Sequence, residues 1–162
     1  MIRRFGWIAA AVSLAAQPLA ADGTADPETA ARLHAEAMTL VDEPTRWYDA
    51  AVLLERSAAE LEVSDPRATE TMRFAGHVFA QAGRYDRAQA TLEAAGDLAL
   101  ARGDLAAAAH AFVQSAHAAA LRGSADDARR LGWRVALIAE SPLLSADEKS
   151  SVLGRIGALV RG

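Results

Sequence analysis

Apolar residues recur along this chain at the spacing of one helix face, in about seven successive segments. The segment that begins near residue 66 illustrates the pattern, with apolar residues at Ala68, Met72, Ala75, Phe79 and Ala82. Residues three and four positions apart lie on one side of a helix, so each segment offers one apolar face for packing. No segment alternates apolar and polar residues as a half-buried strand would. The pattern predicts an all-α fold of about seven helices.

Capping signals place the ends of these helices. Aspartate followed by proline, at 26–27 and 65–66, is typical of a helix start, and Ser145 opens a Ser-x-x-Glu capping box. Glycines suited to a left-handed C-terminal cap follow three of the segments, at Gly83, Gly103 and Gly123. The signals predict one domain over 22–162, made of antiparallel hairpins over about 26–63, 65–103 and 104–141 and a C-terminal capping helix over 145–161.

Small residues return every twenty positions at three phases of the pattern. The columns are Ala68, Ala88, Ala108 and Ala128; Gly76, Gly96, Ala116 and Ala136; and Gly83, Gly103 and Gly123. A fixed period is the mark of stacked, equivalent units. Short loops alone would also suit a closed bundle. Only a stack requires the same phase to be small in every unit, so the register favours stacked hairpins.

Residues 1–21 have the pattern of an export signal. Arg3 and Arg4 form a basic start, residues 5–16 are uncharged and almost entirely apolar, and small residues precede Asp22. The apolar run is shorter than the roughly 20 residues that span a bilayer. We therefore expect a cleaved signal peptide, with an uncleaved anchor as the alternative. Cleavage would leave a periplasmic or secreted protein with no membrane span.

Composition and motifs narrow the function. The chain has 17 basic and 21 acidic residues, a net charge of −4, whereas a nucleic-acid-binding domain is expected to carry a basic face. It has no cysteine, which excludes a thiol nucleophile, a thiolate metal site and c-type haem attachment. It also lacks G-x-S-x-G, Walker, HExxH and dinucleotide-binding motifs. We expect no enzymatic activity, no cofactor and no nucleic-acid partner.

Residues 71–103 show the order of large and small residues found in one family of helical hairpins. The matching residues are Met72, Gly76 and Phe79 on the first helix and Gly83, Tyr85, Ala88, Leu92 and Ala95 on the second. The stretch resembles a tetratricopeptide repeat (TPR). The family's closing proline is replaced by Leu100, and the hairpin period is forty residues where the family has about 34. The resemblance implies a short right-handed TPR-like solenoid whose concave groove binds proteins or peptides.

The same resemblance assigns the groove to the first helix of each hairpin. The candidate partner-binding residues are Glu70, Arg73, His77 and Gln81 on one such helix and His110, Gln114 and His117 on the next. Arg73 is the best candidate to bind a ligand carboxylate, because a guanidinium offers two parallel donors. The predicted function is that of an exported, non-catalytic, TPR-like scaffold that binds a protein or peptide of unknown identity.

Other interpretations stay open. His77 and His117 lie one hairpin apart and would face the same way, so the chain could instead be an envelope bundle that binds a metal or small molecule. No carboxylate accompanies the pair at ligand spacing, and we assign no metal ligands. The C-terminal helix could be a docking edge instead of a cap. Trp133, beside Gly132, is expected to fill the space that this glycine leaves.

Overall fold

The computed structural model of the chain describes residues 25–159. All seven expected helices are present, and this part of the chain contains no strand. The helices are α1 (Pro27–Val41), α2 (Trp47–Ala59), α3 (Pro66–Gln81), α4 (Tyr85–Ala101), α5 (Leu105–Leu121), α6 (Ala125–Ala139) and α7 (Ala146–Leu159), with a short 3-10 turn, η1 (Pro44–Arg46), before α2. The expected signal peptide over residues 1–21 lies outside the described residues.

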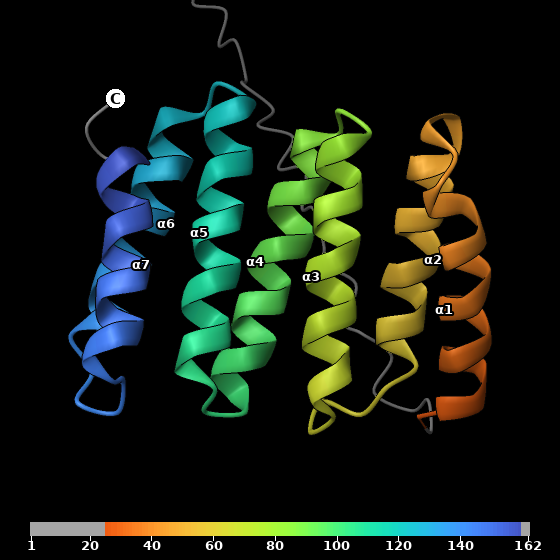
Figure 1. Cartoon of the computed structure of the whole chain (residues 1–162), viewed down its shortest axis with the longest axis horizontal. Helices are drawn as coiled ribbons and strands as arrows, with labels where there is room; N and C mark the ends of the chain where they lie inside the picture. The colour runs from red at the N-terminus through yellow and green to blue at the C-terminus, as the bar shows by residue number, and fades with distance from the viewer. Residues whose placement is uncertain (1–24, 160–162) are drawn as a thin grey trace, which may run out of the picture.

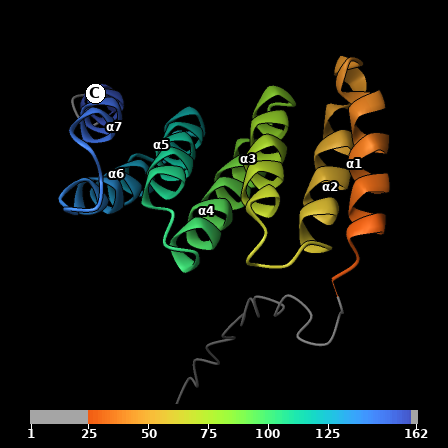
Figure 2. The ribbon, with the colours of Figure 1, turned by 60° about the horizontal axis from the view of Figure 1, so that its bottom comes forward.

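The helices form an open row (Figure 1). Each helix packs against the helices that directly precede and follow it in the chain, and α7 also packs against α5. Helices α1 and α7 stand at opposite ends of the row (Figure 1). When the row is turned, α3, α5 and α7 lie along one side, and α4 and α6 lie along the other (Figure 2). The odd-numbered helices therefore share one face of the row.

Three of the turns between helices have the same geometry. After α3, Gly83 has a φ of 71°, and the N–H of Arg84 donates to the carbonyl of Phe79 at 2.9 Å. The bond closes a Schellman cap, which needs the left-handed conformation that glycine adopts without strain. Gly103 and Gly123 repeat the arrangement with φ of 76° and 83°. The repeated cap gives successive helices the same reversal of direction.

A second set of glycines lies where neighbouring helices touch. A Cβ atom on Gly76 of α3 would lie 2.5 Å from Cγ of Leu92 on α4. One repeat later, a Cβ atom on Gly96 of α4 would lie 2.5 Å from Cε1 of Phe112 on α5. A large side chain of each helix thus occupies the space that a glycine leaves on the helix before it. Glycine is required at these two positions because a side chain there would overlap with the neighbouring Leu92 or Phe112.

Trp133 is a correction to the sequence expectation. It is 71% exposed and does not fill the space beside Gly132. Gly132 lies on the buried side of α6 with Leu131 and Val135. Successive residues of a helix point about 100° apart, so Trp133 points away from the side that the glycine occupies. The interpretation of Trp133 as a core residue is wrong.

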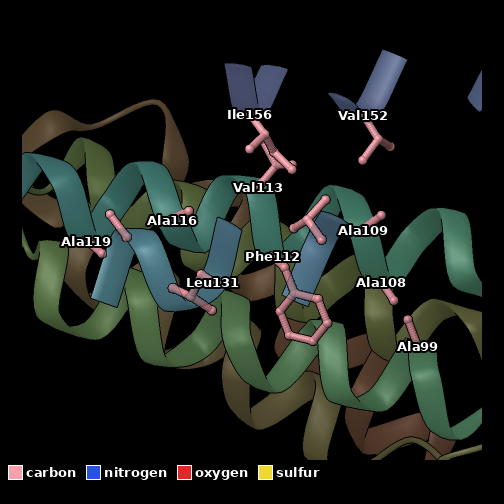
Figure 3. Packing of buried hydrophobic residues seen from close by; sticks show 12 residues of the cluster. Ala99, Ala108, Ala109, Phe112, Val113, Ala116, Ala119, Leu131, Val152 and Ile156 are labelled. Carbon is pink, nitrogen blue, oxygen red and sulfur yellow. The ribbon is translucent and has the colours of Figure 1, made fainter. Parts of the chain in front are cut away.

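The core is built from alanine and a few large side chains. In the cluster formed by α4 to α7, Phe112 and Leu131 are fully buried. Val152 and Ile156 of α7 point toward α5, where Ile156 meets Val113 (Figure 3). A second cluster joins α1 to α4 around the buried side chains of Leu54 and Phe79. The apolar face of α7 therefore covers α5 at one end of the row.

Ion pairs link the even-numbered helices. Glu55 of α2 accepts hydrogen bonds from Arg87 and Thr91 of α4. Glu93 of α4 in turn accepts from Arg130 at 2.7 Å and from Arg134 at 3.0 Å. The bond from Arg130 is the main reason that the pKa of Glu93 lies below its usual value. These bridges join each even-numbered helix to the next one on its own side.

The glycine contact predicts opposite effects for two alanine substitutions. Gly76→Ala should lower the free energy of unfolding by about 1 kcal/mol, because overpacking against Leu92 costs roughly 1–3 kcal/mol and outweighs the helix propensity of about 1 kcal/mol that alanine gains. Gly154→Ala on α7 is the matched control. Nothing lies within 4 Å of its added Cβ, so it should stabilise the protein by up to about 1 kcal/mol. Urea denaturation measures both, and a stabilising Gly76→Ala would contradict the packing.

Candidate functional site

Three hollows overlap along the face of the odd-numbered helices. The first lies between α1 and α3, with a volume of about 470 Å³. It shares Glu70 and Phe74 with a second hollow of about 500 Å³ between α3 and α5. The second shares His77 and Gln114 with a third hollow of about 550 Å³, which reaches α7. The hollows join into one surface across α1, α3, α5 and α7, which we call the groove.

Helix α3 forms the middle of the groove. Glu70, Arg73, Phe74 and His77 fall within two turns of the helix, with Arg73 and Phe74 three and four residues after Glu70, and all four project from one of its faces. The opposite side of α3 carries Ala75, Val78 and Phe79, which are buried in the core. The apolar packing of α3 thus fixes which of its side chains line the groove.

The groove combines an apolar floor with a polar rim. In the third hollow the apolar surface comes from Leu92, Val113 and Leu121. Polar groups around it belong to His77, Gln114, His117 and Arg155. Leu92 is the side chain that packs over Gly76, so the contact that joins α3 to α4 also supplies part of the groove floor.

Most of the residues expected in the groove lie there. Glu70, Arg73, His77, Gln114 and His117 line its second and third hollows. The other two, Gln81 and His110, line none of the three. Gln81 is the exposed last residue of α3, and His110 is half-buried on α5.

Sequence reasoning missed Arg155 and Phe74. Arg155 lies on α7, which the sequence analysis interpreted as a capping helix. Because successive helices alternate between the two sides of the row, α7 is the fourth odd-numbered helix and could have been predicted to line the groove. Phe74 precedes the core residue Ala75 and lines two hollows. Helical phase alone could have found it, because it lies four residues after Glu70.

Two arginines of the groove have no carboxylate partner among residues 25–159. The Nε–H of Arg73 donates to Oε1 of Gln114 at 3.3 Å, and no ion pair of Arg155 is found in that range. On the other side of the row, Arg87, Arg130 and Arg134 are all bound by carboxylates. The positive charge of Arg73 and Arg155 is therefore not neutralised by an ion pair within the described fold.

The positive charges of Arg155 and Arg73 affect the pKa of His110 on α5. Burial is the main reason that its pKa lies below the usual 6.5, and the positive charges of Arg155 and Arg73 lower it further. Glu148 and Asp104 act in the opposite direction but do not cancel the effect. The charges of Arg155 and Arg73 therefore act on a side chain that lies outside the three hollows, on the same helix as Gln114 and His117.

His77 and His117 line the same hollow. Each is exposed, and neither belongs to a group of three or more histidine, aspartate or glutamate side chains that could hold a metal ion in the described part of the chain. An imidazole ring carries two nitrogens that can form hydrogen bonds, so each histidine can bind a polar group of a ligand.

Comparison with family models, with curated proteins and with solved structures found no match to this chain. Among the helices that the structure describes, none is long and apolar enough to cross a membrane. The geometry and chemistry of the groove are therefore the basis for a functional proposal.

The charge beside His110 can be tested directly. Arg155→Gln should raise the pKa of His110 toward 6.5 without reaching it, because burial remains the larger cause. A lowered pKa in the folded state means that folding disfavours the proton, so the free energy of unfolding should fall as the pH drops below about 6.5. Titration of the His110 ring by NMR measures the shift. An unchanged pKa in the variant would show that Arg155 does not act on this site.

Proposed function

We propose that this chain is a TPR-like, right-handed solenoid that acts as a non-catalytic scaffold and binds a segment of another protein in its groove. The continuity of the groove across α1, α3, α5 and α7 is the observation that carries the proposal. A run of three joined hollows suits an elongated ligand better than a compact one. The likeness of residues 71–103 to a tetratricopeptide repeat supports the same function.

The chemistry of the groove favours a ligand that is both apolar and acidic. An apolar side chain of the ligand would cover Leu92, Val113 and Leu121 in the third hollow. A carboxylate, from an acidic side chain or from a peptide C-terminus, would bind Arg73 or Arg155. Ionised hydrogen bonds of this kind contribute about 1.5–3 kcal/mol each. The apolar contact supplies affinity and the arginines fix the position of the ligand.

Export from the cytoplasm is the second part of the proposal. The basic start, the apolar run and the small residues before Asp22 are the features of a signal peptide. We propose that the protein acts in the periplasm or outside the cell. A groove that binds a peptide or protein segment needs neither a cofactor nor a nucleotide, so it can function in that compartment.

A peptide library displayed on phage tests the groove. Selection on the purified protein should enrich short peptides that combine an apolar residue with an acidic residue or a free C-terminus. Arg73→Glu and Arg155→Glu should each lower the affinity of the protein for a selected peptide by at least about tenfold, which corresponds to the loss of one charged hydrogen bond. Helicity should not change, because neither arginine has a carboxylate partner among the described residues, and loss of the 3.3 Å bond from Arg73 to Gln114 should lower the free energy of unfolding by about 1 kcal/mol at most.

Arg56→Glu is the matched control. Arg56 is an exposed arginine of α2 that lines none of the three hollows and has no ion pair among the described residues. It should leave peptide binding unchanged. Failure to enrich any peptide, or equal losses for all three variants, would contradict the proposal.

The two histidines allow a direct test of the alternative function. If the third hollow, which both histidines line, binds a metal, then zinc, copper or nickel should raise the melting temperature, and His77→Ala combined with His117→Ala should abolish the rise. We expect no rise that depends on these histidines. A rise of several degrees that the double variant removes would favour the metal-binding alternative over the peptide-binding scaffold.

A further inference from the structure

Helix α6 has an exposed stripe on the side opposite its core contacts. At its centre are Trp133 and Leu137, with 71% and 72% of their surface exposed. Arg129 precedes them and Glu140 follows them, both exposed. These four residues fall three or four positions apart on one face of the helix, and we call them the α6 stripe. Single exposed apolar side chains are normal on a protein surface, whereas a contiguous apolar patch with a polar rim is the kind of surface that interaction sites use.

The repeat shows what these positions do elsewhere in the fold. Forty residues earlier, Glu93 and Asp97 of α4 stand at the positions of Trp133 and Leu137. Both carboxylates bind arginines of the following even-numbered helix, Arg130 and Arg134 of α6. The equivalent positions of α6 therefore face the place where a further even-numbered helix would lie, and no described helix occupies that place.

The replacement of acidic residues on α4 by apolar residues on α6 changes the kind of helix that can pack at these positions. Glu93 and Asp97 suit a helix that presents arginines, whereas Trp133 and Leu137 suit a helix that presents apolar side chains. Among the described residues, α1 and α2 at the other end of the row offer no such surface. Its exposed large apolar residues are Met38 and Tyr48, and Tyr48 is held under Arg84 and against Phe79. A head-to-tail contact between copies thus lacks an apolar surface at one of its two ends.

We propose that the α6 stripe is a dimer interface, at which α6 packs antiparallel against α6 of a second copy. A two-fold interface brings the same patch together from both subunits, so the patch must complement itself. The α6 stripe has this property. Its apolar centre meets an apolar centre, and its two charged ends have opposite signs.

The register of the helices follows from the sequence. When Trp133 lies against the partner subunit's Leu137, Arg129 lies within one residue of direct opposition to the partner subunit's Glu140. The two-fold axis generates the same pair at the other end. A parallel arrangement would instead bring like charges together. Arg129 pairs with Asp126 on its own helix at 2.8 Å, but both side chains are largely exposed, and such pairs contribute little stability. Arg129 can therefore exchange Asp126 for Glu140 of the partner subunit.

The interface is tested by sedimentation velocity of the purified protein over a range from about 1 µM to 1 mM, which covers weak and moderate dimers. We expect a concentration-dependent dimer. Trp133→Ser combined with Leu137→Ser should weaken it by at least about tenfold, because truncation of a central aromatic residue removes a large part of the binding energy. Circular dichroism should show unchanged helicity, since both residues are exposed. Val63→Ser is the control, because Val63 is an exposed apolar residue outside the α6 stripe, and it should leave the dimer intact.

A charge exchange separates the two-fold interface from unspecific apolar contact. Arg129→Glu alone and Glu140→Arg alone should each weaken the dimer, because each brings two like charges together across the interface. The double variant carries both substitutions, so the two ends of the stripe exchange their charges and opposite signs meet again. It should restore association to within about twofold of the original. A protein that stays monomeric at every concentration would overturn the proposal. So would a dimer that survives loss of Trp133 and Leu137, or one that the charge exchange does not restore.

Discussion

The fold depends on one contact, in which a large side chain occupies the space left by a glycine on the helix before it. Leu92 packs over Gly76 in this way, and Phe112 packs over Gly96. The contact brings α3, α4 and α5 close together at the same phase of each helix. The column of large residues continues with Gly132, and the column of glycines continues with Ala116, so no large side chain makes this contact between α5 and α6. The close contact at two successive steps and the three equal Schellman turns together give an open row in which each helix packs on its neighbours.

The row divides the polar residues between its two sides. On the even-numbered helices, Glu55 and Glu93 bind arginines of the next such helix, and Arg134 also covers the ring of Phe112 at 3.9 Å. On the odd-numbered helices, Arg73 and Arg155 are left without a carboxylate among the described residues. Charge on one side therefore supports the stack, and charge on the other side is available to a ligand. The two proposed binding surfaces therefore lie in different places. The groove would bind a peptide, and the outer side of α6 would bind a second copy of the chain.

The sequence predicted the helices well because their signals are local. Asp26 accepts from the N–H groups of residues 28 and 29, and Ser145 with Glu148 forms the expected reciprocal cap. The groove was predictable only where the repeat could be followed. Glu70, Arg73 and His77 of α3 were predicted, although Phe74 of the same helix was missed. Arg155 was missed because α7 matches no earlier helix in sequence. Trp133 was misplaced for a related reason. Its neighbour Gly132 is buried, but a glycine in a column of large residues does not say which side chain, if any, fills its space.

Gly96 is required at its position because Phe112 occupies the space beside it, and a double-mutant cycle measures this interaction directly. Gly96→Ala is made in the natural chain and in a Phe112→Ala background, and the free energy of unfolding is determined for all four proteins by urea denaturation, with a stabilising osmolyte present in every sample. We expect the effect of Gly96→Ala to change sign. It should destabilise the natural chain by about 1 kcal/mol and stabilise the Phe112→Ala protein by up to about 1 kcal/mol, the helix propensity of alanine over glycine. Equal effects of Gly96→Ala in the two backgrounds would show that the glycine and the ring do not interact, and would contradict the account.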